Sequence, residues 1–475
     1  MIKKLPPASH IFREYDIRGL AEEELTNETA ALIGRAFGSF LAGAGKKEKA
    51  KRTTERREAA ARIAIGHDLR PSSERLVKAL TEGLLASGAD VLDLGLIPTP
   101  LLYFGIIHFH QDAGISITGS HNPTEYNGFK FQLADRPFFG RDIQTLAERI
   151  EREEKQENQE GEKGGMGEKK KAEVIQPYLA ELKQQFHFSK RWKIVMDSGH
   201  GMSALVAPCL FKDLGLEVIE LYTNLDPTFP DHHPDPSIPE NMKDLQNKVR
   251  ETKADLGIAF DGDADRVGVV DEKGEILASD RLLILYARQV LKNEKGAKVI
   301  GDVKCSPLLY DEIRKRGGRP ILWKTGHSLI KAKMKEEKAL LGGELSGHMF
   351  FADRWYGFDD AIYAACRAVE ILDEEKRPFS ELTRDLPKMF STPEIRREVA
   401  SDSKKFEIVR AVVSDLKKNY QVIDLDGARI EFPDGWGLIR ASNTQPVLVM
   451  RFEAQSEKRL SEIRALIEGK IKKYA

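Results

Sequence analysis

Short apolar stretches alternate with amphipathic stretches over most of the chain, and this alternation predicts an α/β protein. In the first part, strands are predicted at 62–66, 91–96 and 114–118, with an amphipathic helix at 76–86. Because strand–helix–strand order favours parallel strands, this part is expected to fold as an α/β domain.

The same alternation restarts twice further along the chain. A strand at 193–197, a helix at 201–213 and a strand at 216–222 form a second βαβ pattern. A helix at 280–291 and a strand at 299–303 begin a third. The restarts indicate additional α/β domains.

The last segment has a different pattern. Closely spaced strands are predicted at 428–432, 437–440 and 447–453, joined by turns such as the Pro-Asp-Gly sequence at 433–435. A helix is expected from Glu457 onward. This segment is therefore predicted to be a smaller α+β domain.

Two charged runs, at 46–58 and 151–171, cannot bury an apolar face, and the second holds no Val, Ile, Leu or Phe. Both are interpreted as solvated helix ends or linkers, since neither interleaves aromatic residues as a nucleic-acid surface would. The second run marks the first domain boundary. Four domains are predicted, at 1–172, 173–275, 276–387 and 388–475.

The composition of the 475 residues excludes several classes of protein. Hydrophobic residues make up 41% and charged residues 31%, which excludes disordered and collagen-like chains. No run reaches the roughly 18 apolar residues that a membrane helix needs. Lys and Arg number 74 and Asp and Glu 75, so no global field recruits nucleic acid or anionic lipid. A soluble protein without nucleic-acid or membrane partners is expected.

The three cysteines, Cys209, Cys305 and Cys366, lie far apart and lack CxxC spacing. This indicates neither a disulfide framework nor a zinc site. A reducing, cytoplasmic location is therefore predicted.

A polar hexapeptide, Thr118 to Pro123 (TGSHNP), follows the predicted strand at 114–118. Loops at strand ends are where an α/β sheet presents its ligands, so Ser120 is a candidate functional residue. Gly119 permits close approach to the backbone, and Pro123 prevents the strand from continuing. Because all these residues also favour turns, an ordinary turn is the alternative.

Three alternate aspartates, Asp261, Asp263 and Asp265, lie between predicted strands at 256–260 and 267–270. Alternate carboxylates in a short loop can bind one hard cation, and without a compensating cation they repel one another. The spacing therefore favours a magnesium site over a purely structural turn.

A calcium-binding EF-hand loop begins with the same spacing, and Glu272 occupies its twelfth position. That interpretation fails because the sixth position requires Gly and is Arg266. An apolar strand also replaces the second half of the loop.

Two further loops carry candidate binding groups. Residues 342–348 (GGELSGH) place an acid, a hydroxyl and an imidazole between glycines, which predicts a pocket for a hydroxylated ligand. For His348 by itself, a structural hydrogen-bonding role is the alternative. Residues 440–446 (RASNTQP) offer a guanidinium, two hydroxyls and an amide, which suit a phosphate. A surface turn with an incidental Arg440 is the alternative.

With these four loops in this order, the chain resembles the α-D-phosphohexomutase superfamily, and within it the bacterial bifunctional phosphomannomutase/phosphoglucomutases. The resemblance covers nearly the whole chain. Gln445 departs from the pattern, and the two charged runs look like local insertions. Further matching motifs lie at 15–19 (YDIRG), 126–130 (YNGFK), 231–236 (DHHPDP) and 324–328 (KTGHS).

The resemblance implies three similar α/β domains and a smaller C-terminal α+β domain around a central cleft. It implies an enzyme that interconverts hexose 1-phosphate and hexose 6-phosphate, of mannose and glucose, through a phosphoserine. Hexose 1,6-bisphosphate is implied as intermediate and activator, and Mg²⁺ as the metal. The implied partners are small-molecule hexose phosphates, with no obligatory protein partner.

The resemblance also assigns roles to individual residues. Ser120 is the implied phosphoserine, and it binds Mg²⁺ together with Asp261, Asp263 and Asp265. Arg18, Lys130 and His348 are the implied groups for proton transfer. The implied substrate contacts are Glu344, Ser346 and His348 at the sugar, Arg440, Ser442, Asn443 and Thr444 at the phosphate that does not react, and Tyr15, Arg266, Lys324, His327 and Arg451 elsewhere in the site.

Other functions are compatible with parts of this pattern. A phosphoglucosamine mutase differs only in the sugar, and a metal-dependent sugar phosphatase would release inorganic phosphate. A non-catalytic sugar-phosphate sensor is expected to lack Ser120 or an aspartate, and the chain keeps them all. The sequence leaves the preference among mannose, glucose and glucosamine phosphates open.

Overall fold

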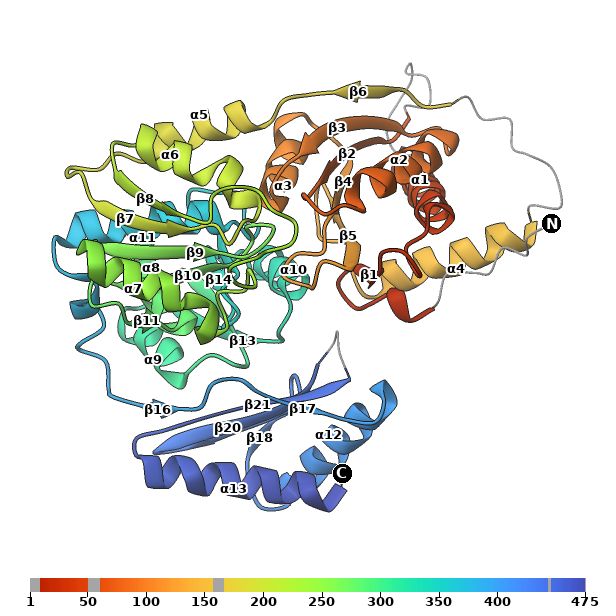
Figure 1. The fold of residues 1–475 in the computed structure, drawn as a ribbon. Coiled ribbons are helices and arrows are strands. Elements are labelled where there is room, and N and C mark those ends of the chain that lie inside the picture. Colours follow the sequence, from red (N-terminus) through yellow and green to blue (C-terminus); the bar gives the residue numbers. More distant parts are fainter. Residues whose placement is uncertain (1–8, 50–59, 157–165, 443–445, 475) are drawn as a thin grey trace. The chain divides into compact units, whose positions relative to one another are not determined.

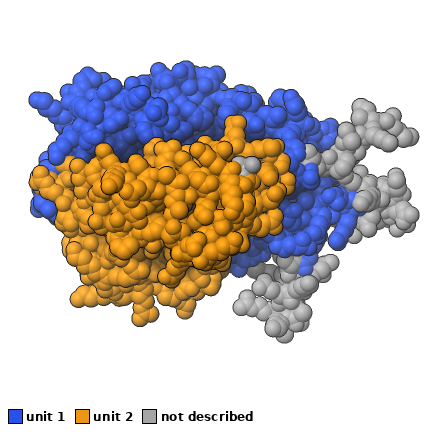
Figure 2. Space-filling view, turned by 90° about the horizontal axis from the view of Figure 1, so that it is seen from below, with its two compact units in different colours: residues 1–277, 347–351, 358–379 blue, residues 278–346, 352–357, 380–475 orange. Residues whose placement is uncertain are grey.

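A computed structural model describes residues 9–49, 60–156, 166–442 and 446–474. Most of the charged run at 46–58 and part of the run at 151–171 lie outside these residues. The chain divides into two compact units, coloured separately in Figure 2. The first comprises residues 1–277, 347–351 and 358–379, and the second comprises residues 278–346, 352–357 and 380–475.

The first unit begins with a six-stranded sheet (Figure 1). In spatial order its strands are β1 (Ile17–Leu20), β5 (Tyr126–Leu133), β4 (Ala113–Ile117), β2 (Arg62–His67), β3 (Asp90–Leu96) and β6 (Lys169–Lys171). Strands β4, β2, β3 and β6 are parallel, whereas β5 and β1 are antiparallel additions. The accompanying helices are α1 (Asn27–Lys49), α2 (Ser73–Ala86), α3 (Thr99–His108) and α4 (Arg141–Gln156).

Alternate residues of β4 pack on opposite faces of this sheet. Ile115 and Ile117 lie in the core formed with α1 and α2. A side chain at Gly114 would instead lie 2.6 Å from Ile106 of α3. Because helices cover both faces, all five residues of β4 are buried. Its carboxyl end leads into the predicted loop at 118–123 that carries Ser120, the serine loop.

The first unit also contains a five-stranded sheet. Its strands, in spatial order, are β11 (Ile276–Leu277), β10 (Val267–Asp271), β9 (Leu256–Phe260), β7 (Lys193–Asp197) and β8 (Glu217–Leu221). The other elements are α5 (Ile175–Gln185), α6 (Ala207–Asp213), α7 (Lys243–Thr252), α11 (Ala361–Glu375) and the short strand β15 (Met349–Phe351). Strands β9 and β10 form a hairpin, and its turn carries the three aspartates.

The helix predicted at 201–213 is in fact divided. A 3₁₀ turn covers Met202–Leu205, and α6 begins only at Ala207. Pro208 lies in the first turn of α6, where its missing N–H needs no partner. The proline therefore starts a new helix, and the prediction of one continuous helix was wrong.

In the second unit, the central strand β12 (Lys298–Asp302) pairs in parallel with β13 (Arg319–Trp323) and β14 (Leu341–Gly343). The helices here are α8 (Ser279–Asn293), α9 (Pro307–Lys315) and α10 (His327–Glu337). The helix and strand predicted at 280–291 and 299–303 correspond to α8 and β12.

The C-terminal part of the second unit is an antiparallel sheet with two helices. The strands are β16 (Phe390–Ser391), β17 (Ile395–Glu398), β18 (Val422–Ile423), β19 (Ala428–Phe432), β20 (Gly435–Ala441) and β21 (Val447–Ala454). Helices α12 (Asp402–Leu416) and α13 (Glu457–Tyr474) share its apolar core. The predicted α+β pattern is confirmed.

Among the described helices, none has both the length and the apolar character of a membrane span.

Candidate active site

Ser120 lies in the loop after β4 and is buried, with 3% of its surface exposed. Its φ of 49° is in the left-handed region, which disfavours residues other than glycine by about 1–2 kcal/mol. Ser120 Oγ donates a hydrogen bond to Asp261 Oδ2 at 3.1 Å and lies 3.1 Å from His121 Nδ1. The hydroxyl is thereby held against the acidic loop.

The three aspartates of the β9–β10 turn converge. Asp261, Asp263 and Asp265 are all buried, and each offers a carboxylate oxygen within 4.8 Å of those of the others. Asp261 Oδ1 accepts hydrogen bonds from the backbone N–H groups of Asp265 and Arg266, at 3.0 and 3.1 Å. These bonds curl the turn so that its alternate side chains point to one place.

Lys130, from β5, lies between two of these carboxylates. Its Nζ donates to Asp263 Oδ2 at 2.7 Å and to Asp265 Oδ2 at 2.6 Å. Burial alone would lower the pKa of Lys130, but the two aspartates outweigh burial and raise it. Lys130 therefore remains protonated and offsets part of the acidic charge.

The aspartates titrate in opposite directions because their surroundings differ. Burial, followed by repulsion from Asp265 and Asp263, raises the pKa of Asp261 well above its ordinary value. Burial also disfavours ionised Asp265, but Lys130 and His348 outweigh it and hold the pKa of Asp265 well below the ordinary value. The charge of this cluster is therefore unevenly distributed.

The cluster fits a hard cation. Its donors are carboxylate oxygens, the ligand type preferred by such ions. Among the described residues, the buried Asp263 Oδ1 has no hydrogen-bond partner. An unsatisfied buried carboxylate oxygen is costly unless a cation or donor compensates it. The geometry and the chemistry of these residues therefore suit a metal ion.

Arg18 contacts the serine loop directly. Its Nη1 donates to the carbonyl oxygen of Gly119 at 2.7 Å and to Asn122 Oδ1 at 3.0 Å. Its Nη2 pairs with Asp16 at 2.7 Å.

Burial, together with the positive charges of Arg266 and Arg18, lowers the pKa of His121 well below its ordinary value. The imidazole beside Ser120 is therefore neutral near pH 7.

His348, directly before β15, contacts the turn that carries the three aspartates. Its Nε2 lies 3.2 Å from Asp265 Oδ1 and 3.3 Å from the Nε donor of Arg266. Because Nε2 cannot donate to Asp265 and accept from Arg266 at once, these contacts correspond to different protonation states.

The structure thus brings together six predicted site positions: Ser120, the three aspartates, Lys130 and His348. Arg18 and Arg266 flank them, and Tyr15 is buried just before β1.

Other predicted site residues belong to the second unit. Glu344, directly after β14, is buried, and its Oε1 accepts from the backbone N–H of Gly326 at 2.5 Å. This bond ties the 342–348 loop to the 324–328 loop. Lys324 is exposed, His327 is half-buried at the start of α10, and Ser346 is half-buried.

Arg440 and Ser442 are buried at the end of β20, whereas Asn443 and Thr444 lie outside the described residues. Arg440 Nε donates to Asp426 Oδ2 at 2.9 Å, and the same oxygen accepts from the backbone N–H of Thr325 at 3.1 Å. Asp426 therefore connects two predicted binding loops. Arg451 is buried and pairs with Asp280 Oδ2 at 2.9 Å.

Three residues that hold these loops were given no role from the sequence, although His233 lies in the matching motif at 231–236. Asp68 and Arg70, just after β2, bind the serine loop. His233 Nε2 contacts the carbonyl oxygen of His121. The available signal was positional: polar residues follow β2, whose parallel neighbour β4 leads into Ser120.

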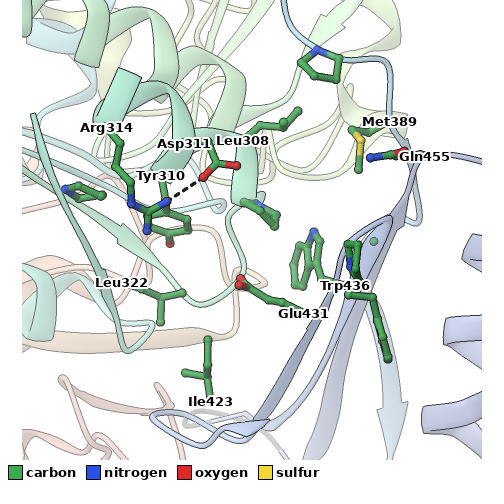
Figure 3. A pocket seen from close by; sticks show the side chains of 16 residues that line it. Leu308, Tyr310, Asp311, Arg314, Leu322, Met389, Ile423, Glu431, Trp436 and Gln455 are labelled. Atoms are coloured by element: carbon green, nitrogen blue, oxygen red, sulfur yellow. Dashed lines mark hydrogen bonds and ion pairs between the residues drawn. The ribbon is translucent and has the colours of Figure 1, made fainter. Parts of the chain in front are cut away.

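The second unit also contains a pocket of about 390 Å³ (Figure 3). Leu308, Leu322, Ile423 and Trp436 give it apolar walls. On its rim Asp311 and Arg314 pair with each other at 2.7 Å. None of the described site residues lines this pocket.

The first unit thus combines two α/β sheets with a buried serine beside an acidic cluster that suits a cation. Comparison with protein families agrees. The α/β/α domains I, II and III of the phosphoglucomutase/phosphomannomutase family match residues 9–157, 176–274 and 278–390, and its C-terminal domain matches residues 394–470. The chain belongs to this family, which confirms the predicted composition of three α/β domains and a smaller C-terminal domain.

Similar proteins cover nearly all of the chain. The phosphomannomutase/phosphoglucomutase of Pseudomonas aeruginosa is 45% identical over 98% of this chain and 96% of its own length. The phosphoglucomutase of Neisseria meningitidis serogroup A is 42% identical over 97% of each chain. A phosphoglucomutase/phosphomannomutase family protein from Burkholderia thailandensis has a solved structure with a TM-score of 0.87, 40% identity and 98% coverage of both chains.

Proposed function

We propose that the protein interconverts the 1- and 6-phosphates of mannose and glucose, with Ser120 as the phosphoryl carrier and hexose 1,6-bisphosphate as intermediate and activator. The observation that carries the proposal is the contact between Ser120 Oγ and Asp261 Oδ2, 3.1 Å apart within a buried acidic turn. Such a site positions a serine hydroxyl where a cation can neutralise phosphoryl charge. The family membership supports the reaction.

The proposed metal is Mg²⁺, held by Asp261, Asp263 and Asp265 with a phosphoryl oxygen on Ser120. When bound, Mg²⁺ neutralises charge on the phosphoryl group and supports its transfer. A phosphoserine adds about −1.5 to −2 charge to the three carboxylates. Lys130, which already bridges Asp263 and Asp265, offsets one of these charges.

The proposed reaction has two balanced steps. First, the P–O bond to Ser120 breaks while a free sugar hydroxyl bonds to phosphorus, and the proton of that hydroxyl passes to the protein. The resulting bisphosphate then turns around. Next, Ser120 Oγ takes the other phosphoryl group, and the released sugar oxygen receives a proton. Phosphoserine is regenerated, so no net phosphate is consumed.

We assign the proton transfers to Arg18, Lys130 and His348, because each contacts the serine loop or the acidic turn. Arg18 holds Gly119, Lys130 holds Asp263, and His348 lies beside Asp265. We also propose that Arg266, whose Nε donates to His348 Nε2, contacts the substrate.

Recognition of the sugar is assigned to residues of the second unit. Glu344 and Ser346 bind hydroxyls, and Arg440, Ser442, Asn443 and Thr444 bind the phosphate that does not react. Because glucose and mannose differ only at C2, a contact with the O3 and O4 hydroxyls accepts both. The remaining proposed substrate contacts are Tyr15, Lys324, His327 and Arg451.

Coupled assays with glucose, mannose and glucosamine 1-phosphates, read beside release of inorganic phosphate, test this function. Conversion of the first two sugars without stoichiometric phosphate release is expected. Discrimination above about a thousandfold, or ~4 kcal/mol, would show that some residue reads O2. Phosphate release without isomer formation would instead identify a sugar phosphatase, and preference for glucosamine phosphate a phosphoglucosamine mutase.

We also propose a cellular location and a set of domain boundaries for the protein. All three cysteines are unpaired, which supports the cytoplasm as the proposed location. The domain boundaries at 172, 275 and 387 also remain a proposal.

A further inference from the structure

Arg70 lies beneath the loop that carries Ser120, and its side chain is completely buried. It follows β2, and β2 pairs in parallel with β4, with His67 opposite Ile117. The backbone N–H of Asp68 continues this pairing by donating to the carbonyl oxygen of Ile117 at 2.9 Å. The two loops therefore leave the same sheet edge side by side.

The guanidinium of Arg70 uses all of its donors. A guanidinium has five N–H groups in a fixed fork, and five acceptors surround this one. Nη2 donates to the carbonyl oxygens of Ser120 (2.9 Å) and Asn122 (2.5 Å), Nη1 donates to those of Tyr126 (2.9 Å) and Pro123, and Nε donates to Asp68 Oδ2 (3.2 Å). Four of the five acceptors are thus backbone carbonyls of residues 120–126, from the serine loop to the first residue of β5.

Asp68 holds the other side of the same loop. Its Oδ2 accepts from Thr118 Oγ1 at 2.8 Å and from the backbone N–H of Gly119 at 2.9 Å. Its Oδ1 accepts from the backbone N–H of Arg70 at 3.1 Å. Arg70 therefore binds the carbonyls and Asp68 binds the donors of the turn.

The shape of the loop depends on this pair. At Gly119 an added Cβ would lie 2.3 Å from Arg70 Cζ, so the close approach that glycine permits is an approach of Arg70. Ser120 has the unfavourable φ of 49°, and both sides of the residue are fixed: its N–H binds Thr118 Oγ1 at 2.8 Å and its carbonyl binds Arg70. The hydrogen bonds offset the strain of this conformation.

We propose that Arg70 is a positioning residue for phosphoryl transfer, which fixes Ser120 Oγ and keeps the carbonyl oxygens of its loop away from the phosphoryl group, with Asp68 orienting Arg70. The inference rests on the proposed role of Ser120. A carbonyl oxygen turned towards a phosphoryl group would repel it, and a nucleophile misplaced by about 1 Å can lose roughly a hundredfold in rate. Among the described residues, Arg70 hydrogen-bonds to Asp68 and to the serine loop but to none of Asp261, Asp263 and Asp265, so its hydrogen bonds act through the serine loop.

The test compares Arg70→Lys and Arg70→Met with Arg75→Lys. Arg75 is a matched control because it also donates to backbone carbonyls, those of Ala21 and Leu25, and has no hydrogen bond to the serine loop among the described residues. Lysine has three donors and methionine none, so the loop should be held progressively less well. Three quantities are measured: kcat and KM for glucose 1-phosphate, phosphorylation of dephosphorylated enzyme by glucose 1,6-bisphosphate, and hydrogen exchange of peptides covering residues 117–126.

We expect kcat to be highest in the parent enzyme, lower in Arg70→Lys and about a hundredfold below the parent in Arg70→Met. The KM of both variants should stay within about threefold of the parent value. Phosphorylation of Ser120 should slow in the same order, and exchange should rise at 117–126 but not at distant peptides. Values of kcat within threefold of the parent in both variants would overturn the proposal. So would a uniform rise in exchange across the first unit, because that would show general destabilisation.

The exchange measurement also separates this inference from the proposed function. If the parent enzyme isomerises no hexose phosphate, the function fails, while local loosening at 117–126 would still show that Arg70 holds the loop. If the parent enzyme is active and exchange at 117–126 is unchanged in the Arg70 variants, only the positioning role is rejected.

Discussion

The loops around Ser120 and the predicted sugar and phosphate loops differ in how their charged side chains are arranged. In the first unit, buried charges form one cluster, in which Lys130 bridges Asp263 and Asp265. In the described loops of the second unit, charges meet in single pairs, as Arg440 does with Asp426, or bind backbone N–H groups, as Glu344 does with that of Gly326.

The difference follows from the task proposed for each region. Stabilising a phosphoryl group during transfer requires fixed charges in a site of low dielectric constant. Recognising a sugar in two orientations requires side chains presented on a stable loop. Substitutions in the first region are therefore expected to lower kcat, and substitutions in the second to raise KM.

The largest effect is expected for Ser120→Ala, which removes the proposed carrier of the phosphoryl group. Turnover of glucose 1-phosphate should fall at least about a thousandfold, and intact-mass measurement should show no phosphate on the variant, in contrast to the phosphate expected on the parent enzyme. Ser203→Ala is the control, since Ser203 is buried and its Oγ has no hydrogen-bond partner among the described residues. Fully active parent enzyme that carries no phosphate after exposure to glucose 1,6-bisphosphate would contradict the assignment.

Asp263→Asn should produce the next largest loss, about a hundredfold in kcat, because it weakens the cation site and leaves Lys130 with one carboxylate. Chelation should abolish turnover of the parent enzyme, and Mg²⁺ should restore it. Calorimetric titration with Mg²⁺ measures binding directly. Asp271→Asn, at the far end of β10, is the control. Undiminished activity of Asp263→Asn in chelator would reject the metal site.

Arg440→Lys should raise KM for glucose 1-phosphate about tenfold and change kcat less than threefold, because lysine lacks the planar fork that matches a phosphate. Steady-state kinetics measures both. Arg459→Lys is matched to it, since Arg459 also pairs with an aspartate of the C-terminal domain, Asp434 at 3.0 Å. A fall in kcat at constant KM would place Arg440 with the catalytic residues and contradict the difference expected between the two regions.

The smallest effect concerns stability rather than activity. Burial lowers the pKa of His232, but its hydrogen bond to Asp197 outweighs burial and raises the pKa from 6.5 to about 9. Protonation of His232 therefore stabilises the folded state. This stabilisation is complete below pH 6.5 and is lost as the pH rises through about 9.

Asp197→Asn should lower the melting temperature by a few degrees at pH 6.5 and flatten its decline between pH 6.5 and 9, the range set by the two pKa values of His232. Thermal unfolding followed by circular dichroism at several pH values measures this. The same decline in the variant as in the parent protein would show that other groups cause it.

Several expectations about individual loops could be made from the sequence because they depend on local patterns. The apolar run of β4 ends at Ile117, and the polar residues after it form the expected loop. The alternate aspartates lie in the turn of a hairpin, and this geometry makes their side chains converge. The division of the helix predicted at 201–213 was missed, because a proline in a first turn resembles one inside a helix.

The α/β alternation, the loop after β4 and the acidic turn could be predicted from the sequence, since hydrophobic periodicity and turn chemistry act over a few residues. Which charged side chains meet depends on the tertiary structure. Lys130 and Asp263 are 133 positions apart in the chain, and Arg70 and Ser120 are 50 apart. Arg451, expected at the substrate, is paired with Asp280. Such pairs arise from strand order and register, which bring distant residues together and are not encoded in any short segment of the chain.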